Sequence, residues 1–166
     1  MILALDLATS TGYAYSDDVG SISCSGSVKF KGTPGEKFNS LYKWLEDQIL
    51  TNRPSVVVFE KPHFRGSAAT MLCVGFAAVV QMLTTTYNIQ LIGVSSRTVK
   101  SFATNNRDAD KEAMTSAARE ATGKDLNTKE DNDQADAIHI ARWGAWALQN
   151  PEVLESKPKK KVKTKK

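Results

Sequence analysis

The chain has 166 residues, 41% of them hydrophobic, which is enough for one well-buried domain. Its two cysteines, Cys24 and Cys73, lie far apart, which excludes a disulfide-rich scaffold and a paired-cysteine metal site and favours a reduced, intracellular protein. The net charge of +4 is unevenly distributed, because residues 157–166 carry seven lysines and no acid, whereas the preceding 156 residues carry 15 basic and 18 acidic groups.

The first third of the chain predicts three strands and a helix. An apolar run leads to Asp6 and is limited to strand length by the turn residues Thr9, Ser10 and Gly12. Two stretches in which β-branched, aromatic and small residues alternate follow it and predict an antiparallel meander: residues 12–18 and 20–30. Pro34 and Gly35 then open a helix over 36–51, with a core-facing stripe of Phe38, Leu41, Leu45 and Ile49.

The remainder predicts alternating strands and helices. The run "PSVVVFEKP" indicates a buried strand that ends at Glu60. A long apolar helix, a strand and three more helices are expected over residues 67–87, 89–95, 97–103, 111–121 and 132–150. This order predicts one mixed α/β domain over 1–150, with five strands and helices on both sheet faces.

The C-terminal residues and the most apolar segment bear on whether the chain binds nucleic acid or a membrane. We expect Pro151 to end the last helix and residues 151–166 to form a disordered Lys-rich tail, whose charge suits phosphate backbones but also a purely solubilising role. The apolar segment 71–83 is interrupted by Gly75 and Gln81 and is short for a membrane span, so no membrane partner is expected.

The position of Asp6 within an apolar strand has two explanations. An ionised carboxylate there is costly unless it is hydrogen-bonded or binds a cation. Actin-like ATPases and RNase H-like nucleases both place an aspartate on the first strand. The ATPases need two duplicated lobes and a second phosphate-binding turn, for which this chain is too short, so the nuclease interpretation is favoured.

A pair of acids opens the last predicted helix. Asp133 and Asp136 are three residues apart and flank the packed face of that helix, whereas Asp131 points elsewhere. Either a cation or the helix dipole could offset their repulsion. Together with Asp6 and Glu60 they could converge on a two-metal site, because oxygen ligands suit Mg²⁺ or Mn²⁺ and two such ions can hydrolyse a phosphodiester.

Five segments carry a resemblance to a known family: "LALDLATSTGYAY", "VVVFEKPHF", "VSSRTVKSFAT", "DADKEAM" and "DNDQADAIHIA". In this order they resemble the RuvC-type Holliday junction resolvases of the RNase H-like superfamily, especially compact phage versions, over nearly all of residues 1–150. The resemblance implies an RNase H-like fold and two Mg²⁺ ions per active site, with Mn²⁺ as an alternative. The implied metal ligands are Asp6, Glu60, Asp133 and Asp136, and the implied lysines beside the scissile phosphate are Lys100 and Lys111.

The resemblance also implies a substrate and an assembly. Four-way DNA junctions are the expected substrate, and a homodimer the expected enzyme, with the helix over 67–87 as either its dimer face or a core helix. Phe64 matches an aromatic that stacks on an unpaired base, although it lies one position off the family's spacing. Lysines of the tail are expected to add DNA affinity: Lys159, Lys160 and Lys161. His139 is expected to be a packed or surface histidine rather than a site residue.

Two other functions fit the same residues. The chain could cleave flaps, forks or other branched DNA, or it could be a non-catalytic DNA-binding relative, although all four acids are present. A cytoplasmic location is expected, in the host cytoplasm if a phage encodes the chain. The tail sequence "PKKKVK" would also suit a nuclear protein.

Overall fold

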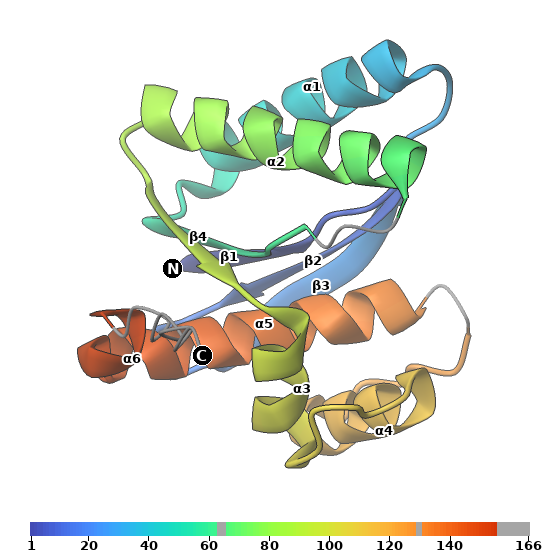
Figure 1. Ribbon diagram of the computed structural model, residues 1–166. Helices are drawn as coiled ribbons and strands as arrows, with labels where there is room; N and C mark the ends of the chain where they lie inside the picture. Colours follow the sequence, from blue (N-terminus) through green and yellow to red (C-terminus); the bar gives the residue numbers. More distant parts are fainter. Residues whose placement is uncertain (63–65, 129–130, 156–166) are drawn as a thin grey trace, which may run out of the picture.

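The computed structural model describes residues 1–62, 66–128 and 131–155, which form a five-stranded sheet with helices on both faces (Figure 1). The strands lie in the order β3-β2-β1-β4-β5. Their bounds are β1 Ile2–Asp6, β2 Ser10–Ser16, β3 Ile22–Lys29, β4 Val56–Glu60 and β5 Gln90–Val94. The helices are α1 Pro34–Asn52, α2 Ser67–Thr86, α3 Ser96–Thr104, α4 Lys111–Thr122, α5 Asp131–Gln149 and α6 Pro151–Glu155. This is the fold class that the sequence predicts.

Strand β1 joins an antiparallel half of the sheet to a parallel half. It pairs antiparallel with β2, and β2 pairs antiparallel with β3, so the predicted meander is confirmed. On its other side β1 runs parallel to β4, with Leu5 opposite Phe59, and β4 runs parallel to β5. Parallel strands end at the same edge of a sheet. Asp6 and Glu60, each one residue beyond the Leu5–Phe59 pair, therefore lie at one edge.

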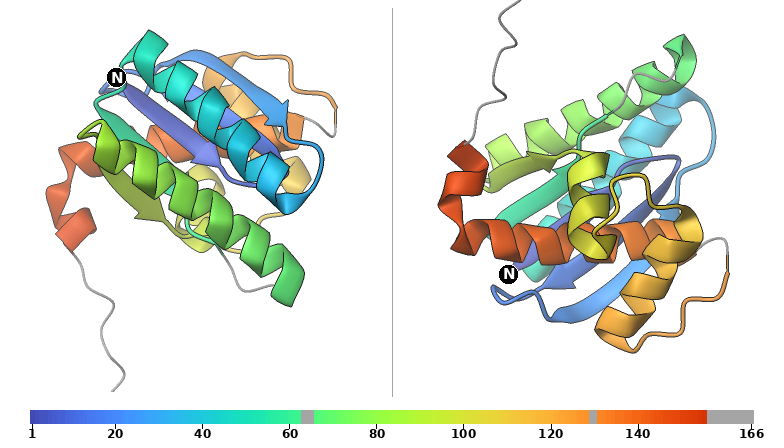
Figure 2. Two further views of the ribbon diagram at one scale, coloured as in Figure 1. Left: turned by 90° about the horizontal axis from the view of Figure 1, so that it is seen from above. Right: turned by 60° about the horizontal axis from the view of Figure 1, so that its bottom comes forward.

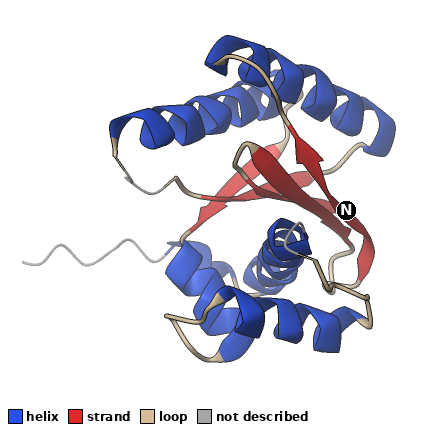
Figure 3. Cartoon of the chain, turned by 90° about the vertical axis from the view of Figure 1, so that its right-hand side faces the viewer, coloured by secondary structure: helices blue, strands red, loops and turns tan. Residues whose placement is uncertain are grey.

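The two faces of the sheet pack against different helices (Figures 2 and 3). Leu3 and Leu5 of β1 belong to the core under α1 and α2, whereas Ile2 and Ala4 belong to the core under α5. Successive strand residues point to opposite faces, so a strand that is covered on both sides needs an unbroken apolar run. This explains the "ILAL" and "VVVF" runs.

Helix α1 has a capping box at its start. The Thr33 hydroxyl accepts from Glu36 N, and the Glu36 carboxylate accepts from Thr33 N at 2.7 Å. The helix begins at Pro34, two residues before the expected start, because proline is suited to the first helical position. The predicted stripe is confirmed for its buried residues Leu41, Leu45 and Ile49.

Helix α2 buries one face and exposes the other. The buried side chains are Phe76, Val80 and Leu83. The exposed ones form an apolar stripe: Met71 is 70% exposed, Val74 47% and Met82 52%. Within the described residues, Ala68–Thr86 is the one stretch long and apolar enough to cross a membrane, and 22% of it is buried. The helix therefore contributes a core face and, separately, an apolar surface.

The end of the domain differs from the expectation. Helix α5 ends at Gln149, but Pro151 begins the short helix α6 instead of a linker. Asn150 connects them: its side-chain amide donates to the Trp146 carbonyl at 2.7 Å, and its own carbonyl accepts from Val153 N at 3.0 Å. A proline can start a helix as readily as it follows one. The tail from residue 156 onward lies outside the described residues.

Candidate active site

Five carboxylates line one cavity of about 330 Å³: the four predicted ones, Asp6, Glu60, Asp133 and Asp136, and that of Asp110 before α4. Asp6 and Glu60 come from the neighbouring ends of β1 and β4, and Asp133 and Asp136 come from the first turns of α5. The cavity is also lined by Lys100 of α3 and Lys111 of α4. The structure thus brings together all six residues that the sequence and the resemblance predict for the site.

Gly12 allows the start of α5 to approach the sheet. It is the cross-strand partner of Asp6, and a Cβ added to it would overlap the backbone carbonyl group of Asp133. Only a residue without a side chain fits between strand and helix at this point. Farther along α5, a Cβ on Gly144 would stand 2.7 Å from Val58 Cγ2. The helix consequently lies directly on the sheet, which carries Asp133 and Asp136 toward Asp6.

Side chains next to these acids fix the first turns of α5. Gln134 Nε2 donates to Ser25 Oγ of β3 at 2.9 Å, and Asn132 Oδ1 accepts from Thr115 Oγ1 of α4 at 3.0 Å. Asp131 accepts from Thr128 N at 2.6 Å, outside the cavity, as the sequence predicts. The helix start is therefore held on the sheet side by Gln134 and on the α4 side by Asn132.

The turn after Asp6 has its own hydrogen bonds. The buried Thr11 hydroxyl donates to the Ala8 carbonyl at 2.7 Å and accepts from Ala8 N at 3.3 Å. Phe30 N donates to the Thr9 carbonyl at 2.8 Å and links this turn to the end of β3. The "LATST" segment thus forms a tight connection between β1 and β2 that holds the carboxyl end of β1 in place.

The acids of the cavity repel one another. Burial raises the pKa of Asp6 well above its usual range, and the charges of Asp136, Glu60 and Asp133 raise it further, against the opposing effect of Lys111. Burial and the Asp133 charge raise the pKa of Asp136 to about 6, although Lys111 and Lys100 act to lower it. Two lysines thus offset only part of the negative charge of the four carboxylates.

The two lysines differ in their surroundings. Lys100 is half-buried, and its ammonium donates to the Ala109 carbonyl at 2.6 Å, so it also ties α3 to the loop before α4. Lys111 is exposed at the first position of α4, next to Asp110, whose carboxylate caps that helix by accepting from Ala113 N at 2.9 Å. One lysine is therefore fixed by the fold and the other is free to reorient within the cavity.

The donor set fits a hard divalent cation. Every acidic group in the cavity offers oxygen atoms, which Mg²⁺ and Mn²⁺ prefer, and the pKa of Asp6 is raised first by burial and then by neighbouring negative charge, which a cation would offset. Among the described residues, however, no three His, Cys, Asp or Glu side chains stand close enough to hold one ion between them. The cavity therefore has ligand atoms of the right chemistry, although the described side chains do not surround a single point.

The remaining predictions concern a histidine, an aromatic residue, the tail lysines and the role of the helix dipole. His139 is fully buried, and its Nε2 donates to the Met114 carbonyl at 2.9 Å, so it is a packed histidine as expected. Phe64 and the tail lysines lie outside the described residues: Lys159, Lys160 and Lys161. The alternative that Asp133 and Asp136 serve only the helix dipole does not account for their position in the cavity with Asp6.

Sequence reasoning missed the residues that position α5. The sequence predicts Gly12 as a turn residue and the start of a strand, and it gives no role to Asn132 or Gln134. The spacing of Asn132 and Gln134 around Asp133 was the available signal, because polar side chains on both sides of a site residue can reach different neighbours. Their partners, Thr115 and Ser25, are far away in the sequence, so the contacts had no local pattern.

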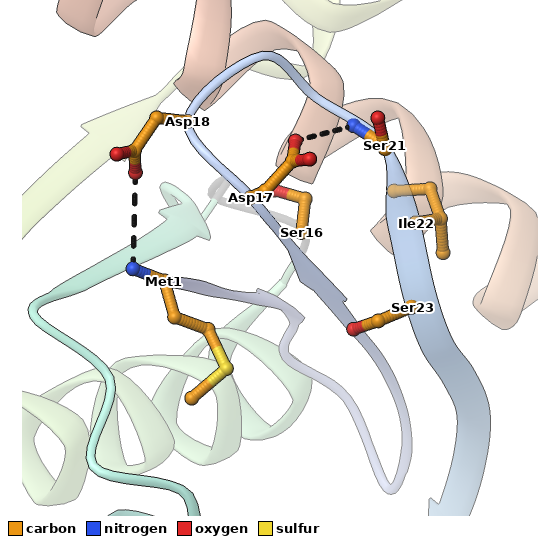
Figure 4. Close-up of a pocket in the computed structure, with 7 residues that line it drawn as sticks. All are labelled: Met1, Ser16, Asp17, Asp18, Ser21, Ile22 and Ser23. Carbon is orange, nitrogen blue, oxygen red and sulfur yellow. Dashed lines mark hydrogen bonds and ion pairs between the residues drawn. The ribbon is translucent and has the colours of Figure 1, made fainter.

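A second cavity, of about 400 Å³, lies at the opposite end of the sheet, beside the β2–β3 turn (Figure 4). Asp17 accepts from Ser21 N at 2.8 Å and from Val19 N at 3.1 Å, and the N-terminal ammonium of Met1 is 3.8 Å from the Asp18 carboxylate. Both acids are thus engaged with the turn and the chain end, and this cavity does not contribute to the acidic site.

Comparisons with known proteins give matches at the level of structure. No model of a known protein family matches, and neither does any curated protein sequence. The RuvC structure from Thermus thermophilus matches with a TM-score of 0.71 and 16% identity, over 90% of this chain and 96% of RuvC. The same protein in complex with a Holliday junction substrate gives 0.74 and 17%, over 90% of this chain and 95% of RuvC.

The yeast mitochondrial Holliday junction resolvase Ydc2 is similar as well. It matches with a TM-score of 0.61 and 15% identity, over 93% of this chain and 81% of Ydc2. The shared features include the mixed sheet with strand order β3-β2-β1-β4-β5 and the helices packed on it. The chain therefore has the RuvC-like form of the RNase H fold.

Proposed function

We propose that this chain is a metal-dependent endonuclease that cleaves branched DNA, with four-way junctions as its main substrate. The observation that carries the proposal is the cavity in which four carboxylates from β1, β4 and α5 meet two lysines from α3 and α4. Such a set of oxygen ligands and cations suits hydrolysis of a phosphodiester, whose negative charge increases as the bond breaks.

Each residue has a role in this proposal. Asp6, Glu60, Asp133 and Asp136 would hold two Mg²⁺ ions, or Mn²⁺ ions. When bound, the metals supply an activated water and charge stabilisation at the phosphate. Lys111, which is exposed, would contact the phosphate, and the products would carry 5′-phosphate and 3′-hydroxyl ends. Lys100 would act beside it while keeping its bond to the Ala109 carbonyl.

The choice of four-way junctions draws support from two sources. The five sequence segments resemble junction resolvases, and a structure with the same fold was determined with a Holliday junction substrate. The acidic cavity itself would be the same in an enzyme that cleaves flaps or forks. A direct comparison of substrates is therefore needed to identify the branched DNA that the protein prefers.

The enzyme is proposed to act as a homodimer. Symmetric cleavage of a junction needs two active sites related by a two-fold axis. The apolar stripe of Met71, Val74 and Met82 on α2 is a surface that a second copy could cover, because large apolar side chains gathered on one face mark contact sites. Helix α2, which carries this stripe, lies on the sheet face opposite α5 (Figure 1).

The decisive experiment compares labelled DNA substrates. A four-way junction, a flap, a fork and a linear duplex are incubated with the protein in Mg²⁺ and in EDTA. Paired symmetric nicks in the junction alone, lost in EDTA, support the proposal. Equal cleavage of flaps and forks would contradict the preference for four-way junctions but would still agree with the proposed metal site. Binding without cleavage of any substrate in Mg²⁺ or Mn²⁺ would contradict catalysis and leave a DNA-binding relative.

A further inference from the structure

A third cavity, of about 420 Å³, lies between α3 and the C-terminal half of α5. Helix α3 separates it from the acidic cavity, because different faces of this helix line the two. Ser96, Val99 and Lys100 line the acidic cavity. The third cavity is lined by Arg97, Thr98, Ser101, Phe102, Arg107, Trp143 and Trp146. Residues three and four apart share a helix face, which explains this division.

The third cavity offers hydrogen-bond donors and positive charge. Arg97 and Arg107 are exposed, and within the described residues neither forms an ion pair. No carboxylate is among the side chains that line the cavity. Arginine presents several N–H donors in a planar fork that matches phosphate oxygens. The charge and geometry of the lining therefore favour a phosphate group.

Trp143 adds an unused donor. Its side chain is 4% exposed, and its Nε1–H has no hydrogen-bond partner in the described structure. A buried indole N–H usually finds an acceptor, since leaving it without one costs free energy. The tryptophan lies in the wall of the third cavity. Because that nitrogen is itself buried, the tryptophan lines the cavity through its other atoms.

Trp146 supplies an aromatic surface in the same cavity. It is 41% exposed, and its ring centroid stands 5.7 Å from that of Phe102, with an angle of 41° between the ring planes. Packing on Phe102 holds the indole in place while leaving part of it open to solvent. Exposed aromatic rings beside positive charge are the usual platform for nucleic-acid bases.

We infer that the third cavity is a binding site for a nucleotide unit, whose phosphate contacts Arg97 and Arg107 and whose base stacks on Trp146. The site needs neither metal nor the four carboxylates, so it does not depend on the proposed nuclease activity. Its ligand is either a free nucleotide or one nucleotide of a DNA strand. In the second case, the strand would pass from the acidic cavity around α3.

The test measures tryptophan fluorescence of the full chain in EDTA, where no metal-dependent cleavage takes place. The probes are dTMP and a short single-stranded oligothymidylate. Stacking on Trp146 should quench the emission with saturation. Of the three tryptophans, Trp44 contacts Tyr13 and Phe30 on the other side of the sheet and should not respond. Quenching by dTMP would identify a free-nucleotide site, and quenching by the oligonucleotide alone a strand site.

Variants separate this cavity from general electrostatic attraction. The double variant R97Q/R107Q should bind the responding probe at least tenfold more weakly and reduce the slope of log affinity against log salt by about one. The matched double variant R53Q/R119Q removes two exposed arginines outside the cavity and should keep the slope closer to that of the unsubstituted protein.

Trp146→Ala tests the stacking contact independently of charge. Its affinity, measured by anisotropy of a labelled oligothymidylate, should fall roughly tenfold, within the range found for base–aromatic stacking. Trp44→Phe should retain full affinity. Absence of quenching by both probes, or equal binding by R97Q/R107Q and R53Q/R119Q, would overturn the inference. Both results are readable whether or not the protein cleaves junctions.

Discussion

Gly12 of β2 and Asp133 of α5 meet backbone to backbone, with no room for a side chain between them. Gly12 also pairs across the sheet with Asp6, so this single position connects a carboxylate of the sheet with one of the helix. The separation of the two carboxylates is set by this contact.

Gly12→Ala should therefore displace the start of α5. The added methyl group would overlap the Asp133 carbonyl, and such overpacking costs about 1–3 kcal/mol of the free energy of unfolding. Cleavage should fall more steeply than stability, because Asp133 and Asp136 would move away from Asp6. Urea unfolding and junction cleavage measure the two effects. Gly35→Ala, in α1, where an added methyl group meets nothing within 4 Å, is the control: it should leave cleavage unchanged and should not lower stability, because alanine favours a helix over glycine.

Asp6→Asn should abolish cleavage and preserve junction binding. The amide keeps the shape of the side chain but loses the charge that binds metal. It also removes a carboxylate that burial and three neighbouring acids destabilise, so the metal-free variant should be more stable than the unsubstituted protein. Cleavage and binding assays, with thermal unfolding in EDTA, provide the measurements. The control variant Asp108→Asn changes an exposed residue outside the cavity and should cleave normally. Normal cleavage by Asp6→Asn would exclude the proposed metal site.

The acidic cavity should make metal-free stability depend on pH. The pKa of Asp136 is raised to about 6 in the folded protein, so between about 4 and 6 the folded state holds more protons than the unfolded state. The free energy of unfolding in EDTA should include a contribution that is complete below pH 4 and decreases as the pH rises through 6. Asp136→Asn should remove it, as seen by urea unfolding at several pH values.

A contrasting variant checks the sign of this effect. Hydrogen bonding to the Thr128 backbone lowers the pKa of Asp131, so that carboxylate stabilises the fold at neutral pH and its contribution is lost on acidification. Asp131→Asn should thus lower the free energy of unfolding at pH 7. It should still show the decrease in this free energy that Asp136 causes as the pH rises through 6. Mg²⁺ at pH 7 should stabilise the unsubstituted protein and not Asp136→Asn. Equal slopes for both variants would show that Asp136 does not titrate in this range.

Deletion of residues 157–166 should weaken DNA binding and flatten its salt dependence, with cleavage at saturating enzyme preserved. Seven lysines are removed, and each lost phosphate contact reduces the slope against log salt by about 0.9 for duplex DNA. A tail of the same length with serine in place of lysine separates charge from length. A slope that is the same with and without the lysines would show that the tail does not contact DNA.

The stripe on α2 should mediate dimer formation. The double variant M71E/M82E places two charges on exposed apolar positions and should yield a monomer in analytical ultracentrifugation. The monomer should still nick junctions but lose the paired, symmetric cut. Val19→Glu is the control, because Val19 lies in the β2–β3 turn and is 77% exposed. A dimer that persists in M71E/M82E would assign the interface to another surface.

The sequence predicts the element order and the residues that meet in the cavity, for identifiable reasons. The "ILALD" and "VVVFE" runs are buried on both faces and end in acids, and their parallel pairing follows from the helix between them. In contrast, Gly12 acts through a distant helix, and the Gln134–Ser25 bond joins residues 109 positions apart. The local signal of Pro151 correctly predicts the end of α5 at Gln149, but the expected linker is wrong, because Pro151 begins α6.

The metal site is predicted from the sequence in its residues but not in its side-chain geometry. Spacing places Asp133 and Asp136 on one helix face and Asp6 and Glu60 at one sheet edge, and the structure confirms that all four line the same cavity. It does not determine rotamers. In the described residues the carboxylates are near enough to raise the pKa of Asp6, which burial already raises, but they are not arranged around one point.

The distance along the chain between the two halves of the acidic cavity affects when the cavity can exist. Asp6 leaves a ribosome well before Asp136, which follows only after all five strands have been synthesised. Contacts between such remote segments form late, because the intervening loop must close first. A nascent chain can thus build its sheet while still lacking half of its carboxylates. Any activity of this cavity is withheld during synthesis, and the arrival of α5 completes it.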